Sequence, residues 1–207
     1  AGKGIDYLPY FIYTFEELGN IGIGKGRGNY KLLSVKDGSE QVYSIEGKVF
    51  RNTVSKELHI SEEFEFCSGT DSDPGSEDTV TLIFSTPARI KYQRSLAVEI
   101  EFHILIRSLL RRLCLMYYFH CGGTEPSWDY KGLIRESENV IIEKNSLKWR
   151  DWERYSSRQD VRMKMGGVIG DITYRGNLKT FLPILKAGEI LHVGKGTSFG
   201  LGQYEIQ

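Results

Sequence analysis

The sequence HVGKGTSFGLGQYEIQ, residues 192–207, places four glycines between Gly194 and Gly202, before a short alternating apolar stretch. Glycine allows a positive backbone φ and lets another segment approach closely. A second stretch, ELGNIGIGKGRGNYKLLSV at residues 17–35, holds five glycines between Gly19 and Gly28. A segment with the alternation of a strand follows each set of glycines. We therefore expect two similar loops, one near each end of the chain.

The residues before the C-terminal loop predict an α+β domain. Pro87 is expected to end its first strand, and Gly188 to follow the end of its second helix, which Asn177 caps. Apolar periods of two and of 3.6 predict strands at 79–85, 139–143, 163–174 and 201–206, and helices at 98–118 and 177–186. The order strand, helix, strand, strand, helix, strand is that of the ferredoxin-like (RRM-like) βαββαβ fold, with the glycine-rich loop before its last strand.

The early stretch predicts part of a second domain of this kind. A helix at residues 10–18, the glycines and a strand at 29–35 repeat the last part of the C-terminal pattern. The acidic, proline-containing segment CSGTDSDPGSED at 67–78 is typical of a linker. We expect residues 1–78 to be the β-rich remainder of a first ferredoxin-like domain plus this linker, and residues 79–207 a complete domain. The chain would then be the C-terminal portion of a longer protein.

Neither glycine-rich loop fits a nucleotide-binding motif. Gly19 and the Gly24-Lys25 pair have the spacing of a P-loop, but Gly26 stands where Ser or Thr would hold magnesium. The expected helix also precedes this loop, whereas phosphate-binding loops lead into a helix. In this sequence we expect no helix after the C-terminal loop. These features exclude nucleotide hydrolysis and hydride transfer.

The charge of the chain is divided between its two ends. The net charge is zero, but Lys and Arg number 8 against 14 Asp and Glu over residues 1–78, and 19 against 13 over residues 79–207. A basic part favours a polyanionic partner such as nucleic acid, although a solvated surface can have the same charge. Three cysteines without a C-x-x-C pair indicate neither a disulfide framework nor a zinc site. We expect a cytoplasmic protein with no cofactor, no metal and no membrane span.

The segment Lys148–Lys164, KWRDWERYSSRQDVRMK, is the strongest candidate for a nucleic-acid contact. It holds six basic and three acidic residues, interleaved with Trp149, Trp152 and Tyr155. Aromatic rings stack on unpaired bases, and arginines bind phosphates. The alternative is that the tryptophans are core residues and the arginines pair with the three acidic residues. The predicted RNA-binding residues are Arg154, Tyr155 and Arg158 here, Lys25 and Arg27 in the first loop, and Gly194, Lys195, Gly196, Thr197, Ser198, Gly200 and Gly202 in the second.

The glycine-rich end HVGKGTSFGLGQYEI resembles the signature of the RAMP superfamily, and residues 79–207 resemble the C-terminal domain of its CRISPR-associated precursor-crRNA-processing endoribonucleases. The segments that carry the resemblance are STPARIK at 85–91, LLRRL at 109–113, RYSSRQ at 154–159 and MGGVIG at 165–170. YFIYTFEELGNIGIGKGRGNYKL at 10–32 resembles the end of the family's first ferredoxin-like domain. The resemblance implies tandem domains, CRISPR repeat RNA and other CRISPR-associated proteins as partners, and metal-independent cleavage that leaves a cyclic phosphate.

Such cleavage needs a base for the 2′-hydroxyl proton, and histidine is the usual choice near neutral pH. His192 stands at the edge of the C-terminal loop and is the candidate, whereas His59, His103 and His120 are interpreted as structural. The family's base is usually a histidine of the first domain, in a part that this chain is expected to lack. A non-catalytic crRNA-binding subunit of an interference complex is therefore the alternative function.

Overall fold

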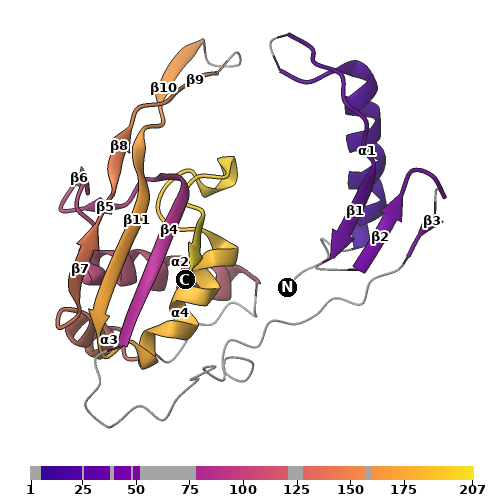
Figure 1. Cartoon of the computed structure of the whole chain (residues 1–207). Helices are drawn as coiled ribbons and strands as arrows, with labels where there is room; N and C mark the ends of the chain where they lie inside the picture. Colours follow the sequence, from indigo (N-terminus) through magenta and orange to yellow (C-terminus); the bar gives the residue numbers. More distant parts are fainter. Residues whose placement is uncertain are drawn as a thin grey trace. The chain divides into compact units, whose positions relative to one another are not determined.

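The computed structural model describes residues 6–24, 26–37, 40–47, 49–51, 78–120, 128–156 and 160–207. The chain divides into two compact units, residues 1–58 and 59–207 (Figure 1). In the described part of the chain, no helix is both long and apolar enough to cross a membrane.

The C-terminal unit is built on an antiparallel sheet in the order β12-β4-β11-β7, with β8 also paired to β11. Its helices α2 and α4 connect β4 to β7 and β11 to β12, and a short helix α3 follows α2. This order and these connections are those of the ferredoxin-like fold, which confirms the predicted fold class for the unit. The bounds are β4 Asp78–Ala88, α2 Phe102–His120, α3 Tyr130–Ser137, β7 Ile141–Asn145, β8 Lys148–Arg150, β11 Gly167–Gly176, α4 Leu182–Leu191 and β12 Tyr204–Ile206.

The core lies between the sheet and its helices (Figure 1). Alternate residues of β4, among them Leu82 and Phe84, are buried against the apolar face of α2. Two buried tyrosine hydroxyls fasten the layers, since Tyr174 donates to the Ile100 carbonyl at 2.7 Å and Tyr204 to the Leu185 carbonyl at 2.5 Å. Burial raises the pKa of both tyrosines, so each stays a neutral hydrogen-bond donor.

Three expected boundaries are wrong: Pro87 does not end its strand, Gly188 does not follow its helix, and Asn177 does not cap that helix, whose N-cap is Phe181. Pro87 lies inside β4 instead of ending it, because the pairing with β11 shifts register there and no amide donor is needed. Gly188 lies inside α4, which begins at Leu182 after a 3₁₀ turn at Lys179–Phe181 and continues to Leu191. A Cβ on Gly188 would lie 2.1 Å from the Tyr204 hydroxyl. Close packing, and not a helix end, explains this glycine.

The expected strand at 163–174 is divided between two strands. Its beginning belongs to a separate two-stranded hairpin, β9 Glu153–Ser156 and β10 Val161–Lys164, and its remainder to β11. Figure 1 shows the β9–β10 hairpin extending beyond the end of the main sheet. A smaller hairpin, β5 Lys91–Tyr92 and β6 Ser95–Leu96, follows β4.

The N-terminal unit holds one helix, α1 Leu8–Ile21, and a three-stranded antiparallel sheet, in the described residues. Glycines follow the helix as expected, but the first strand begins at Ser34 and not at residue 29. That this unit is the remainder of a first ferredoxin-like domain stays a prediction. The strands, in sheet order, are β1 Ser34–Asp37, β2 Glu40–Ser44 and β3 Val49–Phe50.

We expect Gly188→Ala to lower the free energy of unfolding. Overpacking typically costs about 1–3 kcal/mol, which offsets the about 1 kcal/mol by which alanine favours a helix over glycine. The displaced Tyr204 hydroxyl would also lose its bond to Leu185. Urea unfolding followed by circular dichroism measures the change. Ile190→Ala, at an exposed position of the same helix, is the control and should stay within about 0.5 kcal/mol of the wild type. A Gly188→Ala protein as stable as this control would contradict the packing argument.

Candidate nucleic-acid interface

The glycine-rich loop, residues 193–203, closes on itself and on the end of β4. The Val193 amide donates to the Gly202 carbonyl at 2.9 Å, which closes the base of the loop. The Lys195 amide donates to the Arg89 carbonyl at 2.9 Å, and the Gly202 amide donates to the Pro87 carbonyl at 3.1 Å. These bonds fix the loop between α4 and β12.

The glycines of this loop are required by its backbone. All four have φ between 74° and 85°, where side chains are rarely tolerated. A Cβ on Gly202 would lie 1.8 Å from the Val193 carbonyl oxygen, and one on Gly194 would lie 2.6 Å from the Arg89 carbonyl oxygen. Gly196 and Gly200 flank the 3₁₀ turn η3, Thr197–Phe199. The unusual dihedrals of the loop therefore require these four glycines.

The same loop presents polar groups at its surface. Lys195 and Ser198 are exposed and Thr197 is half-buried. The amides of Thr197 and Ser198 donate no hydrogen bond to any described residue. One cation and two amide donors are thus available to an anionic ligand at the tip of the loop.

His192 links α4 to the loop in a strained conformation. Its φ of 60° and ψ of 170° lie in a region that is normally occupied by glycine alone. Its ring nitrogen Nδ1 is buried without a hydrogen-bond partner among the described residues. Non-glycine residues in such conformations cluster at functional sites. This geometry keeps His192 as the candidate catalytic residue.

The β9–β10 hairpin separates two residues that the sequence groups together. Register pairs Arg154 with Met163 and Tyr155 with Arg162, and directly paired residues share a face of the hairpin. Arg154 and Tyr155 are consecutive, so they lie on opposite faces. One face of the hairpin therefore carries Arg154 with Met163, and the other carries Tyr155 with Arg162.

The aromatic side chains around this hairpin are exposed. The exposed fractions are 38% for Trp149, 41% for Trp152 and 57% for Tyr155, so neither tryptophan is a core residue. Two of these side chains donate a hydrogen bond to a carboxylate. The Trp149 Nε1 donates to Asp151 Oδ1 at 2.8 Å, and the Tyr155 hydroxyl donates to Asp160, which raises the pKa of Tyr155.

The surface ion-pair network, the alternative for the arginines, is found only in part. Arg162 and Glu153 approach each other at 4.0 Å, and this is the one ion pair seen within residues 148–156 and 160–164. Such exposed pairs contribute little to stability. Basic side chains therefore remain accessible around the hairpin and the loop. The exposed ones are Lys148, Arg150, Arg154, Arg162, Lys164 and Lys195.

The hairpin contacts the glycine-rich loop through Phe199. The Arg154 guanidinium lies over the Phe199 ring, 4.4 Å from its centroid. The Arg89 side chain, at the base of the loop, donates to the Lys164 carbonyl of β10. Phe199 and Arg89 give no local signal in the sequence, because their contacts join segments far apart in the chain. The structure thus brings the predicted residues Arg154 and Lys195 into one surface.

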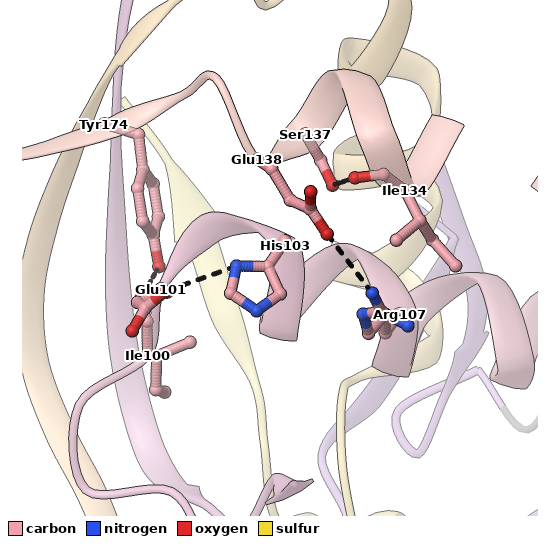
Figure 2. Close-up of polar contacts among 8 residues, drawn as sticks. All are labelled: Ile100, Glu101, His103, Arg107, Ile134, Ser137, Glu138 and Tyr174. Carbon is pink, nitrogen blue, oxygen red and sulfur yellow. Dashed lines mark hydrogen bonds and ion pairs between the residues drawn. The ribbon is translucent and has the colours of Figure 1, made fainter. Parts of the chain in front are cut away.

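A polar cluster on the helical side of the sheet is of a different kind. His103 Nδ1 lies 3.3 Å from Glu101 Oε2 at the start of α2, and Arg107 Nη2 lies 3.4 Å from Glu138 Oε1 (Figure 2). The His103 ring also packs edge-on against Tyr92. These contacts join α2 to β5 and to the end of α3. They agree with the structural role expected for His103.

Some predicted residues lie elsewhere. Lys25 and Arg158, like His59, lie outside the described residues. Arg27 is exposed in the loop after α1, in the N-terminal unit. Within the described ranges, no group of three or more His, Cys, Asp or Glu side chains is arranged to hold a metal ion.

The chain matches models of known protein families. The family model described as CRISPR-associated endoribonuclease Cas6 matches residues 82–204, and one described as an N-terminal domain matches residues 1–57. None of the curated proteins compared with the chain matches it. The match to the first model begins within β4 and ends at the start of β12, so it covers most of the sheet, the hairpin and the glycine-rich loop.

Solved structures with similarity to the chain include Cas6 proteins. A Cas6 (TTHA0078) product complex is 22% identical with a TM-score of 0.41, over 62% of this chain and 51% of that chain. Thermus thermophilus Cas6 (TTHB231) is 14% identical with a TM-score of 0.48, over 64% and 54%. A partial Cas6-RT-Cas1–Cas2 complex is 16% identical with a TM-score of 0.43, over 62% and 22%. The chain covers about half the length of the first two structures.

We expect His192→Gly to raise the free energy of unfolding. Backbone strain of this kind destabilises the folded state by about 1–3 kcal/mol, and glycine would relieve it. Glycine also increases the conformational entropy of the unfolded chain, which reduces this stabilisation. The net increase in the free energy of unfolding should therefore be about 1 kcal/mol. His192→Ala keeps a Cβ and should show no gain. Urea unfolding of the three proteins measures this. A His192→Gly protein less stable than His192→Ala would mean that the backbone here is not strained.

Proposed function

Because this chain belongs to the CRISPR-associated endoribonuclease family described as Cas6, we propose that it binds the repeat RNA of a CRISPR transcript and serves its endonucleolytic processing. The observation that carries the proposal is the surface formed by the β9–β10 hairpin and the glycine-rich loop. Together with the adjoining residues 148–152, this part of the chain carries the exposed rings of Trp149, Trp152 and Tyr155 and six exposed cations. We also propose other CRISPR-associated proteins as partners, as the sequence resemblance implies.

The surface suits RNA because its two kinds of group bind the two parts of a nucleotide. Aromatic faces stack unpaired bases, each worth about 1–3 kcal/mol, and arginines and lysines bind phosphates. The described residues of the open face of the sheet follow another pattern. On β4 and β11 this face carries no aromatic ring, so it lacks the stacking platform of an RNA-recognition motif. Its residues are Thr79, Thr81, Ile83, Ser85, Ile169, Asp171, Thr173 and Arg175. We therefore place the RNA on the hairpin and the loop.

Cleavage by attack of a 2′-hydroxyl on the adjacent phosphate requires three groups. A base removes the hydroxyl proton, a cation stabilises the charge on the phosphorane-like intermediate, and an acid protonates the departing 5′-oxygen. The products are a 2′,3′-cyclic phosphate and a free 5′-hydroxyl. We assign the base to His192, since it is the one histidine of the described chain that borders the glycine-rich loop. Lys195 is the nearest loop residue in sequence that could stabilise the charge.

RNA binding should depend steeply on salt. We expect a CRISPR repeat RNA to bind this chain, and Arg162→Ala or Lys195→Ala to reduce the slope of log affinity against log salt by about 0.7–0.9 each, because each removes one phosphate contact. Fluorescence anisotropy over a salt series measures the slope. Arg111→Ala, on the exposed face of α2, removes the same charge and should leave the slope unchanged. Equal slopes in all four proteins would place the RNA elsewhere.

Cleavage should need no added metal, because acid–base groups suffice for this chemistry. We expect any cleavage by this chain to persist in EDTA, to stop when hydrogen replaces the attacked 2′-hydroxyl, and to fall by about 10²–10⁴-fold in His192→Ala. Gel analysis of labelled repeat RNA measures the rate. Cleavage that survives in His192→Ala would remove His192 as the base. A chain that binds the repeat and never cuts it would instead be the non-catalytic crRNA-binding subunit.

A further inference from the structure

We propose that the glycine-rich loop holds the β9–β10 hairpin in its RNA-binding orientation, and that Arg89 and Phe199 are the positioning residues that transmit this support. The inference rests on the proposed RNA-binding function of the hairpin. It assigns a role to two residues that contact the hairpin, and it changes the role of Arg154 from a phosphate ligand to a link between hairpin and loop.

The hairpin cannot fix its own orientation. β9 and β10 pair with each other and with no other described strand. A two-stranded ribbon is marginally stable at best by itself, so it needs contacts with the rest of the unit. One backbone bond, from the Met165 amide to the Trp152 carbonyl at 2.7 Å, closes its base. The hairpin also continues from the β8–β11 pairing, in which Arg150 faces Gly167. Contacts with other segments fix its direction further.

The inner support is Arg89, directly after β4. Its backbone carbonyl accepts the Lys195 amide of the glycine-rich loop, while its side chain donates to the Lys164 carbonyl at the end of β10. Arg89 packs closely against Gly167 of β11 and against Gly194 of the loop. A Cβ on Gly167 would lie 3.0 Å from Arg89 Cγ, and a Cβ on Gly194 would lie 2.6 Å from the Arg89 carbonyl oxygen. One residue thus joins the loop to the base of the hairpin.

The outer support is the stack of Arg154 on Phe199. Phe199 belongs to the turn η3 between Gly196 and Gly200, and 49% of it is exposed. Hydrogen bonds from the Phe199 amide to Gly196 at 2.9 Å and from the Gly200 amide to Thr197 at 3.0 Å fix that turn. The ring is therefore a fixed platform beneath the Arg154 face of the hairpin.

The two supports leave the opposite face of the hairpin turned away from the loop, with Tyr155 and Arg162 on it. Tyr155 is itself fixed by its bond to Asp160. Holding this face in one orientation before RNA arrives lowers the entropy that binding would otherwise cost. The glycine-rich loop then contributes to affinity through the hairpin as well as through Lys195.

The first test needs no RNA. We measure amide hydrogen exchange in β9 and β10 for the wild type, Phe199→Leu, Phe199→Tyr and Arg89→Ala. We expect exchange about two- to fivefold faster in Phe199→Leu, because this factor corresponds to the free energy of an exposed cation–π interaction. Phe199→Tyr keeps the ring and should exchange at the wild-type rate. Arg89→Ala should also accelerate exchange in the hairpin, whereas Arg111→Ala should not. Unchanged exchange in both Phe199→Leu and Arg89→Ala would overturn the proposal, whatever the chain binds.

The second test is a double-mutant cycle on binding of CRISPR repeat RNA. Arg154→Ala and Phe199→Leu should each weaken binding by about two- to fivefold, and the double variant no more than the stronger single one, because both remove one contact. The salt slope should stay at the wild-type value in Phe199→Leu and Arg154→Ala. Multiplicative losses, or a slope reduced by Arg154→Ala as much as by Arg162→Ala, would show that Arg154 binds phosphate directly and would overturn its assigned role. Changed exchange in a chain that binds no RNA would refute the proposed function and leave the structural support intact.

Discussion

The closure of the glycine-rich loop on the end of β4 is the constraint on which the C-terminal unit depends. The Gly202 amide bonds to Pro87 and the Lys195 amide to Arg89, so the last segment of the chain is fixed beside the first strand of the domain. β12 can then pair with β4 at the edge of the sheet. A Cβ added to Gly202 would lie 1.8 Å from the Val193 carbonyl oxygen, so any side chain there would open the loop. The fold thus requires these glycines independently of any role in a binding site.

The same closure connects folding to the proposed RNA-binding surface. Arg89 bonds to the loop through its backbone and to the hairpin through its side chain, and Phe199 meets Arg154 farther out. A loop built only to bind phosphate would need free amides and charge. Most amides of this loop bond within the loop or to the end of β4, and the loop offers Lys195 and the amides of Thr197 and Ser198 at its tip. Its structure suits support of the hairpin together with a limited contact to the backbone of the proposed RNA ligand.

The strain at His192 fits this division of roles. A histidine in a conformation suited to glycine lowers stability, and such a residue persists where the surroundings impose it. Here α4 ends and the closed loop begins within two residues, so the backbone must reverse at this position. The positive φ of this candidate site residue shows its cost to the fold directly. Its chemical role is what the cleavage assay addresses.

The sequence by itself determined the fold class of the C-terminal unit, because apolar periodicity and the position of the glycines are local properties of the chain. The order of helices and strands could be read from them, as could the basic, aromatic segment Lys148–Lys164. Only the tertiary structure decided that Arg154 and Tyr155 face opposite ways, because strand register depends on pairing across the hairpin. It alone placed Gly188 in a helix against Tyr204, and joined Arg154 to Phe199, since contacts between residues distant in sequence leave no local pattern.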